Sequence, residues 1–193
     1  MAEQDTPTRI LDIAERLVQT RGYNGFSYAD ISSELGVTKA SLHYHFAGKA
    51  ELGEAIIERY ADRFRERLAE IDASGADAPT KLEEYAEIYA GVLREQRMCL
   101  CGMLAAEYET LPGPMREAIV RFFDESETWL AHVLEEGRDS GSLSLPGPAN
   151  EEARAIVDGL EGALLVARPL GDVHRFEATA ARLLARLSPG AAA

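Results

Sequence analysis

Apolar residues along this chain recur at intervals of three and four, which is the spacing of one face of an α-helix. Thr6-Pro7 has the form of a helix start, a capping residue followed by proline in the first turn. Gly22 then ends this first predicted helix, because glycine tolerates the backbone conformation that stops a helix. Its apolar face consists of Ile10, Ile13, Ala14, Leu17 and Val18.

A longer amphipathic helix is predicted from Lys49 to about Ile71. No proline interrupts this stretch, and its apolar residues recur at every fourth position. The sequence by itself shows a long amphipathic rod. Its apolar positions are Leu52, Ile56, Tyr60, Phe64 and Leu68.

The rest of the chain shows no strand-like alternation, and helices separated by Gly- and Pro-rich loops are expected there. The fold class is therefore predicted to be all-α, with about nine helices in total. The first of these later helices is capped by Thr80 and has Leu82, Tyr85, Tyr89 and Val92 on its inward face. The others are expected at Gln96–Tyr108, Met115–Glu136, Glu151 to about Arg168, and His174–Leu187.

Two short helical patterns lie on either side of Gly36. Ser27 is a suitable N-cap for residues 28–35, with Asp30 three positions later, and Thr38 is a suitable cap for residues 39–46. A helix, a tight glycine turn and a second helix are the layout of a DNA-binding helix-turn-helix. Spacing alone leaves a second interpretation open, a small amphipathic helix with a solvated polar face.

Residues 10–60 resemble the N-terminal domain of the TetR family of transcriptional repressors. The matching sequence is ILDIAERLVQTRGYNGFSYADISSELGVTKASLHYHFAGKAEL, and its specific part is Gly-Val-Thr at 36–38 followed by Leu42, Phe46 and Lys49. The resemblance implies a three-helix DNA-binding head over residues 1–50. It also implies a ligand-binding and dimerisation body over residues 51–193.

The resemblance further implies a homodimer that binds palindromic double-stranded DNA, represses transcription and is released by a small-molecule effector. It implies no enzymatic activity and no cofactor. The DNA-binding residues expected from the family pattern are Ser27, Tyr28, Thr38, Lys39, Ser41, His43, Tyr44, His45 and Lys49. His43 departs from the tyrosine that many members carry, so its contact is left open.

A ligand cavity is expected in the body, although aromatic residues and methionines at helical spacing are also typical of an ordinary core. The composition favours an apolar or aromatic effector. Candidate ligand-binding residues are Tyr85, Tyr89, Met98, Cys101, Met103, Leu104, Tyr108, Phe122, Phe123, Trp129 and His132.

The last two helices are the expected dimer interface, because the family dimerises there and Gly159 and Gly162 would let a second backbone approach closely. The alternative is that these glycines face the chain's own core. The candidate interface residues are Ile156, Gly159, Leu160, Gly162, Ala163, Leu164, Ala167, Leu183 and Leu184.

The net charge of −13 is unusual for a DNA-binding protein, but it is unevenly distributed. Residues 1–50 contain five Lys or Arg against six Asp or Glu, so most of the acidic excess lies outside the expected DNA-contacting segment. Strong dependence of DNA binding on salt is expected.

Two cysteines, Cys99 and Cys101, give no disulfide framework and suit a reducing compartment. No signal-peptide pattern or membrane-length apolar run is present, so a cytoplasmic location is expected. An alternative function is a thiol-based sensor of oxidants or electrophiles, which requires a thiolate-stabilising neighbour such as Arg97. Another is a helical small-molecule-binding module without DNA binding.

Enzymatic and metal-binding motifs are missing from the sequence. None of the four histidines follows a glutamate by three residues, and no G-x-S-x-G, phosphate-binding loop or C-x-x-C occurs. His43 and His45 point to different helix faces, so no metal site is predicted. The effector, the operator, the regulated genes and the redox activity of the cysteines are not encoded in any recognisable pattern.

Overall fold

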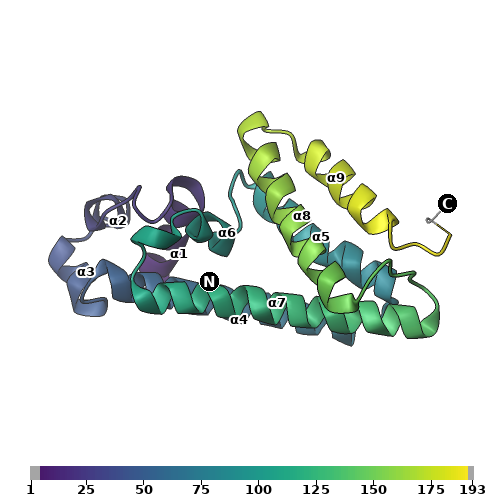
Figure 1. The fold of residues 1–193 in the computed structure, drawn as a ribbon. Helices are drawn as coiled ribbons and strands as arrows, with labels where there is room; N and C mark the ends of the chain where they lie inside the picture. The colour runs from purple at the N-terminus through teal and green to yellow at the C-terminus, as the bar shows by residue number, and fades with distance from the viewer. Residues whose placement is uncertain (1–4, 191–193) are drawn as a thin grey trace. The chain divides into compact units, whose positions relative to one another are not determined.

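The computed structural model describes residues 5–190, and all regular secondary structure in that range is helical (Figure 1). The all-α prediction is therefore confirmed, with nine α-helices and one short 3-10 helix in the described part of the chain. The elements are α1 Thr6–Arg21, α2 Tyr28–Leu35, α3 Lys39–His45, α4 Lys49–Ala73, α5 Ala78–Arg94, α6 Leu100–Ala105, η1 Tyr108–Thr110, α7 Gly113–Ser140, α8 Ala149–Leu170 and α9 Val173–Ala185.

Two helices begin earlier than the sequence predicts, because an aspartate takes the capping role. Asp5 accepts a hydrogen bond from the Thr8 backbone N–H at 3.1 Å, so Thr6 is the first helical residue of α1 rather than its cap. Asp77 accepts from the Thr80 backbone N–H at 3.1 Å and begins α5 in the same way. The cap satisfies an N–H group that has no partner inside the helix.

The prediction of one helix over Gln96–Tyr108 is wrong. The structure has only the short α6 there, and Gln96 has a positive φ of 60° just after α5. Met98, Cys99, Leu100 and Cys101 are all buried. A continuously buried run has no polar face, so its periodicity carries no information about helix boundaries.

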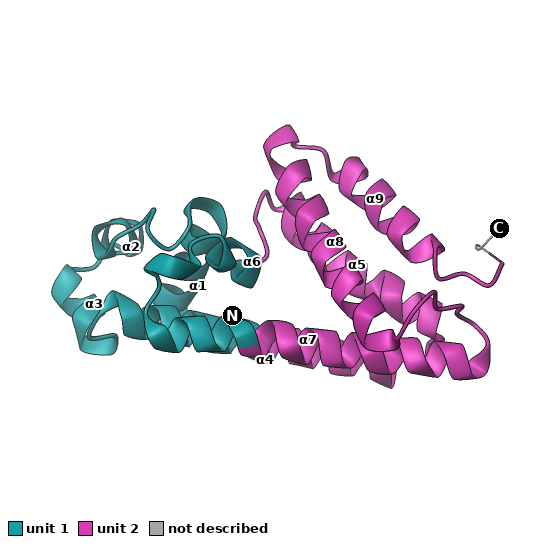
Figure 2. Cartoon of the chain, viewed as in Figure 1, with its two compact units in different colours: residues 1–62, 100–120 teal, residues 63–99, 121–193 magenta. Residues whose placement is uncertain are grey.

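Packing divides the chain into two compact units (Figure 2). Unit 1 comprises the described residues up to Asp62 together with Leu100–Val120, so α6, η1 and the start of α7 belong with α1, α2 and α3. Within it, α1 packs on α2 and α6, and α2 packs on α3. Its fully buried side chains include Ile10, Leu17, Ile31, Leu42, Leu52 and Ile56.

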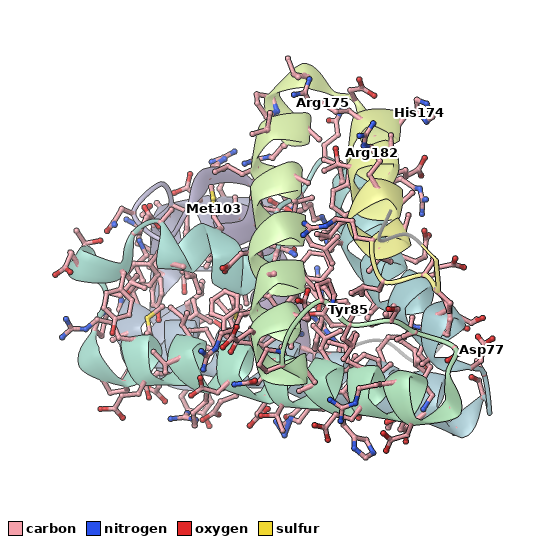
Figure 3. All side chains as sticks on the ribbon, turned by 45° about the vertical axis from the view of Figure 1, so that its right-hand side comes forward. Asp77, Tyr85, Met103, His174, Arg175 and Arg182 are labelled. Carbon is pink, nitrogen blue, oxygen red and sulfur yellow. The ribbon has the colours of Figure 1, made fainter. Side chains whose placement is uncertain are left out.

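Unit 2 comprises residues 63–99 and the described residues from 121 onward. Helix α9 packs against both α5 and α8, and α5 also packs against α8. The interior is strongly aromatic, and Tyr85 lies among its packed side chains (Figure 3). Helices α4 and α7 each contribute one part to unit 1 and another part to unit 2. No described helix is both long and apolar enough to cross a lipid bilayer.

Candidate nucleic-acid interface

The turn between α2 and α3 is built on Gly36. Its backbone is left-handed, with φ 73° and ψ 30°, and the N–H groups of Gly36 and Val37 donate to the Ser32 carbonyl at 3.0 and 3.1 Å. A Cβ atom on Gly36 would meet nothing within 4 Å, so glycine is favoured here by backbone conformation and not by crowding. This tight turn sets the direction in which α3 leaves α2.

The inner face of α3 is anchored in unit 1. Thr38 caps the helix by accepting from the Ser41 N–H at 3.2 Å, as the sequence predicts. Leu42 has no exposed surface, and Phe46 directly after the helix is 9% exposed. Two buried side chains four residues apart fix the rotation of this short helix about its axis.

The outer face of α3 remains open to solvent. Thr38, Lys39 and His43 are exposed, while Ser41 and His45 are partly exposed. Tyr44 is 85% exposed, and its described ring contact is an edge-on approach to His45 with centroids 5.1 Å apart. A large aromatic ring held in water gains little from folding, so its position favours a binding role.

The acidic side chains of α2 are compensated within unit 1. Glu34 pairs with Arg16, and Asp30 lies 3.5 Å from Arg21. Asp30 also accepts from the Ser27 hydroxyl and backbone N–H at 2.7 and 2.8 Å, and these bonds lower the pKa of its carboxyl. Ser27 is thereby engaged in a capping box with Asp30, so its hydroxyl positions α2.

Two cations of unit 1 have no such compensation. The side chains of Arg9 and Lys39 are exposed and make no hydrogen bond or ion pair within residues 5–190. The bonds from Thr8 lower the pKa of Asp5, and the charge of nearby His45 lowers it further, so the start of α1 lies near the end of α3. Arg9 therefore joins the candidate interface. No local pattern indicates this role, because Arg9 lies 30 positions before Lys39, the first residue of α3.

Two of the predicted DNA-binding residues face inward. Tyr28 is buried and its hydroxyl donates to the Phe46 carbonyl at 3.1 Å, and burial raises the pKa of this phenol to about 12. Lys49 donates to the Phe26 carbonyl at 2.5 Å, with its ammonium 4.5 Å from the centre of the Tyr23 ring. Burial lowers the pKa of Lys49. Both side chains secure the ends of α2 and α3 and are not directed at a phosphate.

His43 has an intermediate position. Its Nδ1 atom lies 3.1 Å from the Ala47 carbonyl oxygen, and its ring lies 4.8 Å from that of Tyr28. The residue is nevertheless exposed. If Nδ1 carries the proton for this bond, Nε2 is the nitrogen presented to solvent as an acceptor.

A glutamate from the segment after α6 holds the turn between α1 and α2. Glu107 Oε2 accepts from the Tyr23 N–H at 2.5 Å, and Oε1 accepts from the Asn24 N–H at 3.3 Å and its side-chain amide at 3.2 Å. Asn24 also donates to Thr110 at 2.8 Å. We call these four residues the Glu107 cluster. Its two halves, Tyr23 with Asn24 and Glu107 with Thr110, are more than 80 residues apart in the sequence, so no sequence pattern indicates it.

The predicted ligand-binding residues do not form one group. Cys101, Met103, Leu104 and Tyr108 belong to unit 1, and the others belong to unit 2. His132 is directed to solvent, where its Nε2 lies 3.2 Å from Glu136, so its assignment to an interior cavity is wrong. Tyr108 is 38% exposed, since the short η1 helix lies at the surface of unit 1.

The remaining candidates of unit 2 form an aromatic core. Tyr85 bonds to Tyr89 and to Ser126 through the hydroxyls at 3.1 and 2.7 Å. Trp129 stacks on Tyr85 with centroids 5.7 Å apart and donates to Asp72 at 2.8 Å. Phe122 and Met98 are buried, and Phe123 is partly exposed. A separate surface groove of about 360 Å³ along α5 and α9 contains none of the predicted ligand-binding residues.

Four residues of the predicted dimer interface are buried within the single protomer. Ile156, Leu160, Leu164 and Ala167 are at most 2% exposed in the single protomer, so they form its own core and cannot reach a partner. A Cβ on Gly159 would lie 2.7 Å from Leu183 of α9, so this glycine permits packing inside the chain. The opposite face of α8 exposes Leu165 and Leu170 at 60% each, Val166 at 48%, and Gly162.

The described neighbour of Cys99 does not activate its thiol. Cys99 and Cys101 are both buried, and Arg97 pairs with Glu95 at 3.2 Å. The neighbour of Cys99 is the Glu161 carboxyl, which accepts a hydrogen bond from the thiol. An adjacent carboxylate opposes thiolate formation.

Both parts of the sequence match known families of regulators. Residues 10–56 match the family described as bacterial regulatory proteins, tetR family. Residues 78–183 match the family described as tetracyclin repressor-like, C-terminal domain. The second match alone covers more than half of the chain.

Comparison with individual regulators supports the same family assignment. The chain is 30% identical to the HTH-type transcriptional regulator LmrA of Bacillus subtilis over 168 residues, covering 82% of this chain and 86% of LmrA. It is 27% identical to the HTH-type transcriptional repressor NemR of Escherichia coli, covering 86% and 85%. A solved regulator from Agrobacterium tumefaciens is 32% identical and superimposes with a TM-score of 0.92, covering 95% and 97% of the two chains.

Proposed function

This chain belongs to the TetR family of DNA-binding transcriptional regulators, and from that premise we propose that it is a ligand-responsive repressor. In this proposal a homodimer binds a palindromic operator in the cytoplasm, and a small effector in the body releases it. Residues 1–50 read the DNA and residues 51–193 bind the effector and the partner subunit. Regulators of this family are not enzymes.

The observation that carries the proposal is the two-sided character of α3. One face is buried through Leu42, and the other presents Tyr44 at 85% exposure beside Lys39. Such a helix fits a major groove, where cations contact phosphates and an aromatic edge or hydroxyl contacts base edges or a thymine methyl. We assign the outward residues Thr38, Lys39, Ser41, His43, Tyr44 and His45 to the DNA, with Arg9 added as a phosphate contact.

We assign positioning roles to the inward residues of the same region. Ser27 caps α2, Tyr28 bonds to the end of α3, and Lys49 bonds to the turn before α2. Their substitution would change the angle between the two helices, so the effect on DNA affinity would come with a loss of stability.

Dimerisation is proposed through the outward face of α8, with Gly162, Leu165, Val166 and Leu170 as contacts. Exposed apolar side chains at 165, 166 and 170 are costly in water and support a partner surface. Two copies of α3 about 34–36 Å apart would meet successive major grooves of one DNA face. A dimer also doubles the number of bases read, since α3 alone is short.

Effector response is proposed as a population shift. The effector must bind one arrangement of the dimer more tightly than the other, since equal affinity would change nothing. Helices α4 and α7 are continuous between the two units, which supports them as the mechanical connection. The aromatic core of unit 2 supports an effector with an apolar or aromatic body.

Operator binding by variants of α3 tests the proposal. Tyr44→Ala is expected to weaken binding to DNA flanking the protein's own gene about tenfold, and Lys39→Ala to lower the salt slope by about one ion. Tyr108→Ala removes another exposed tyrosine away from α3 and is the matched control. Fluorescence anisotropy across a salt series measures both quantities. Unchanged affinity in both α3 variants would refute the assignment, and failure of the wild type to bind would favour a binding module without DNA recognition.

A further inference from the structure

A polar cluster lies inside the aromatic core of unit 2. Tyr85 bonds to Tyr89 and Ser126, and all three residues are at most 2% exposed. Cys99 donates to the carboxyl of Glu161 on α8. Tyr85 and Tyr89 lie on α5, which packs against α8. Burial raises the pKa of both tyrosines, and the negative charge of Glu161 acts in the same direction. We call these five residues the Glu161 cluster.

The Glu161 carboxyl has fewer hydrogen bonds than it can accept. Its Oε1 atom is buried and has no hydrogen-bond partner within residues 5–190. No ion pair from a lysine, arginine or histidine reaches this carboxyl in the described part of the chain. Burial raises the pKa of Glu161 from 4.5 to about 7, and the bond from Cys99 only partly offsets this. A buried carboxylate without a counter-ion destabilises the folded state, so Glu161 lowers the free energy of unfolding of this protein.

The surroundings of the carboxyl select the kind of group that would satisfy it. The thiol of Cys99 already donates its hydrogen bond to Glu161, and the tyrosine and serine hydroxyls of the cluster bond to one another. The Tyr85 ring belongs to an aromatic group, with Trp129 stacked on it and Phe64 edge-on to it at 6.0 Å. An anion would be repelled by the carboxylate, and an uncharged apolar molecule would leave Oε1 without a partner.

We propose that the effector of this regulator is a small organic cation, a protonated amine on an apolar or aromatic body, with its nitrogen paired to Glu161. An ammonium group donates to Oε1, and its charge also suits the faces of the neighbouring Tyr and Trp rings. The aromatic side chains bury the apolar body of the ligand. This inference rests on the proposed function only in naming the ligand an effector, because the binding site itself is independent of DNA binding.

The protonation of Glu161 gives the proposal a distinctive pH dependence. A cation binds the ionised carboxylate, so binding must expel the proton that Glu161 holds below pH 7. The groups that interact with it are Cys99 before α6 and, through their charge, Tyr85 and Tyr89 on α5, and none of these is cationic. Affinity for an amine that stays protonated is therefore expected to rise with pH through about 7 and then level off.

Calorimetry with matched ligands tests the site. The probes are 3-phenylpropylammonium, the uncharged 3-phenyl-1-propanol and the anionic 4-phenylbutyrate, together with a series of smaller and larger primary and quaternary ammonium ions. Wild type is expected to bind at least one ammonium ion more than tenfold tighter than its uncharged analogue. Glu161→Gln should abolish that preference, and Glu151→Gln on the exposed first turn of α8 should retain it.

The outcomes separate this inference from the repressor proposal. In the absence of ligand, Glu161→Gln must melt cooperatively at or above the wild-type temperature at neutral pH and keep the operator affinity of wild type, so a general loss of folding is visible. Preference for the neutral or anionic probe, equal amine binding by Glu161→Gln, or no binding by any ammonium ion of the series would overturn the cation site. Amine binding by a wild-type protein that fails to bind operator would overturn only the repressor proposal.

Discussion

Replacing Glu107 by glutamine tests whether the Glu107 cluster holds the turn that precedes the DNA-reading helices. Both carboxylate oxygens accept hydrogen bonds, Oε2 from Tyr23 and Oε1 from Asn24. A glutamine has one acceptor oxygen, so its NH₂ group must face either the Tyr23 N–H or the donors of Asn24. The side-chain size is retained, so the change is mainly in charge and acceptor number.

The magnitude follows from the bonds that are lost. A hydrogen bond to a charged group contributes about 1.5–3 kcal/mol, and the partly exposed Asn24 contacts contribute at the lower end. We expect the free energy of unfolding to fall by about 2 kcal/mol. For a chain of this length that corresponds to a decrease in Tm of roughly 4–8 °C. The cost falls on the backbone of the turn, since its N–H groups lose their acceptor.

Urea unfolding, thermal denaturation and amide hydrogen exchange measure this effect. Exchange at Tyr23 and Asn24 should accelerate in Glu107→Gln, while amides in the interior of α8 should change only with the global stability. Glu109→Gln, in the exposed η1 helix of the same segment, is the matched control. Equal stability of the two variants, with unchanged exchange at the turn, would refute the role assigned to Glu107.

Three further predictions concern other parts of the fold. Gly36→Ala should lower the free energy of unfolding by about 1–2 kcal/mol, because the backbone φ of this residue is 73°. Gly91→Ala inside α5, where a Cβ meets nothing within 4 Å, should raise it by about 0.5–1 kcal/mol. Equal urea midpoints for the two variants, or a higher midpoint for Gly36→Ala, would contradict this. Lys81→Ala should cost about 2–4 kcal/mol, because buried Lys81 lies 3.1 Å from both Asp72 and Glu136; a smaller thermal shift than for exposed Arg67→Ala would contradict it. The pKa of Glu161 is raised in the folded state, so the free energy of unfolding of the wild type should fall by up to about 3 kcal/mol as pH rises from 4.5 through 7. Glu161→Gln should remove this decline. The same change in stability between pH 5 and pH 8 for wild type and variant would refute it.

The sequence alone determined the helical character of the chain and the layout of the helix-turn-helix. Apolar residues at intervals of three and four fix which face of each helix is buried, and this is a local property. Gly36 and Thr38 likewise act through the backbone within a few residues of themselves. These local patterns can be interpreted from the sequence without knowing which element covers the helix.

Only the tertiary structure decided which residues are available to other molecules. Tyr28 and Tyr44 are equivalent as sequence signals, yet one is buried against the end of α3 and the other is 85% exposed. The apolar face of α8 is covered by the protomer's own helices, which periodicity cannot distinguish from cover by a second subunit.

The two polar clusters were also decided by tertiary structure. Glu107 accepts a hydrogen bond from Tyr23 across 84 positions of sequence, and the partner of Glu161 is Cys99, which precedes α6. A carboxylate acquires its partners, and its altered pKa, from whatever surrounds it after folding. The physical reason is that hydrogen bonds and desolvation depend on distances of a few ångströms in space, which the order of residues along the chain does not specify.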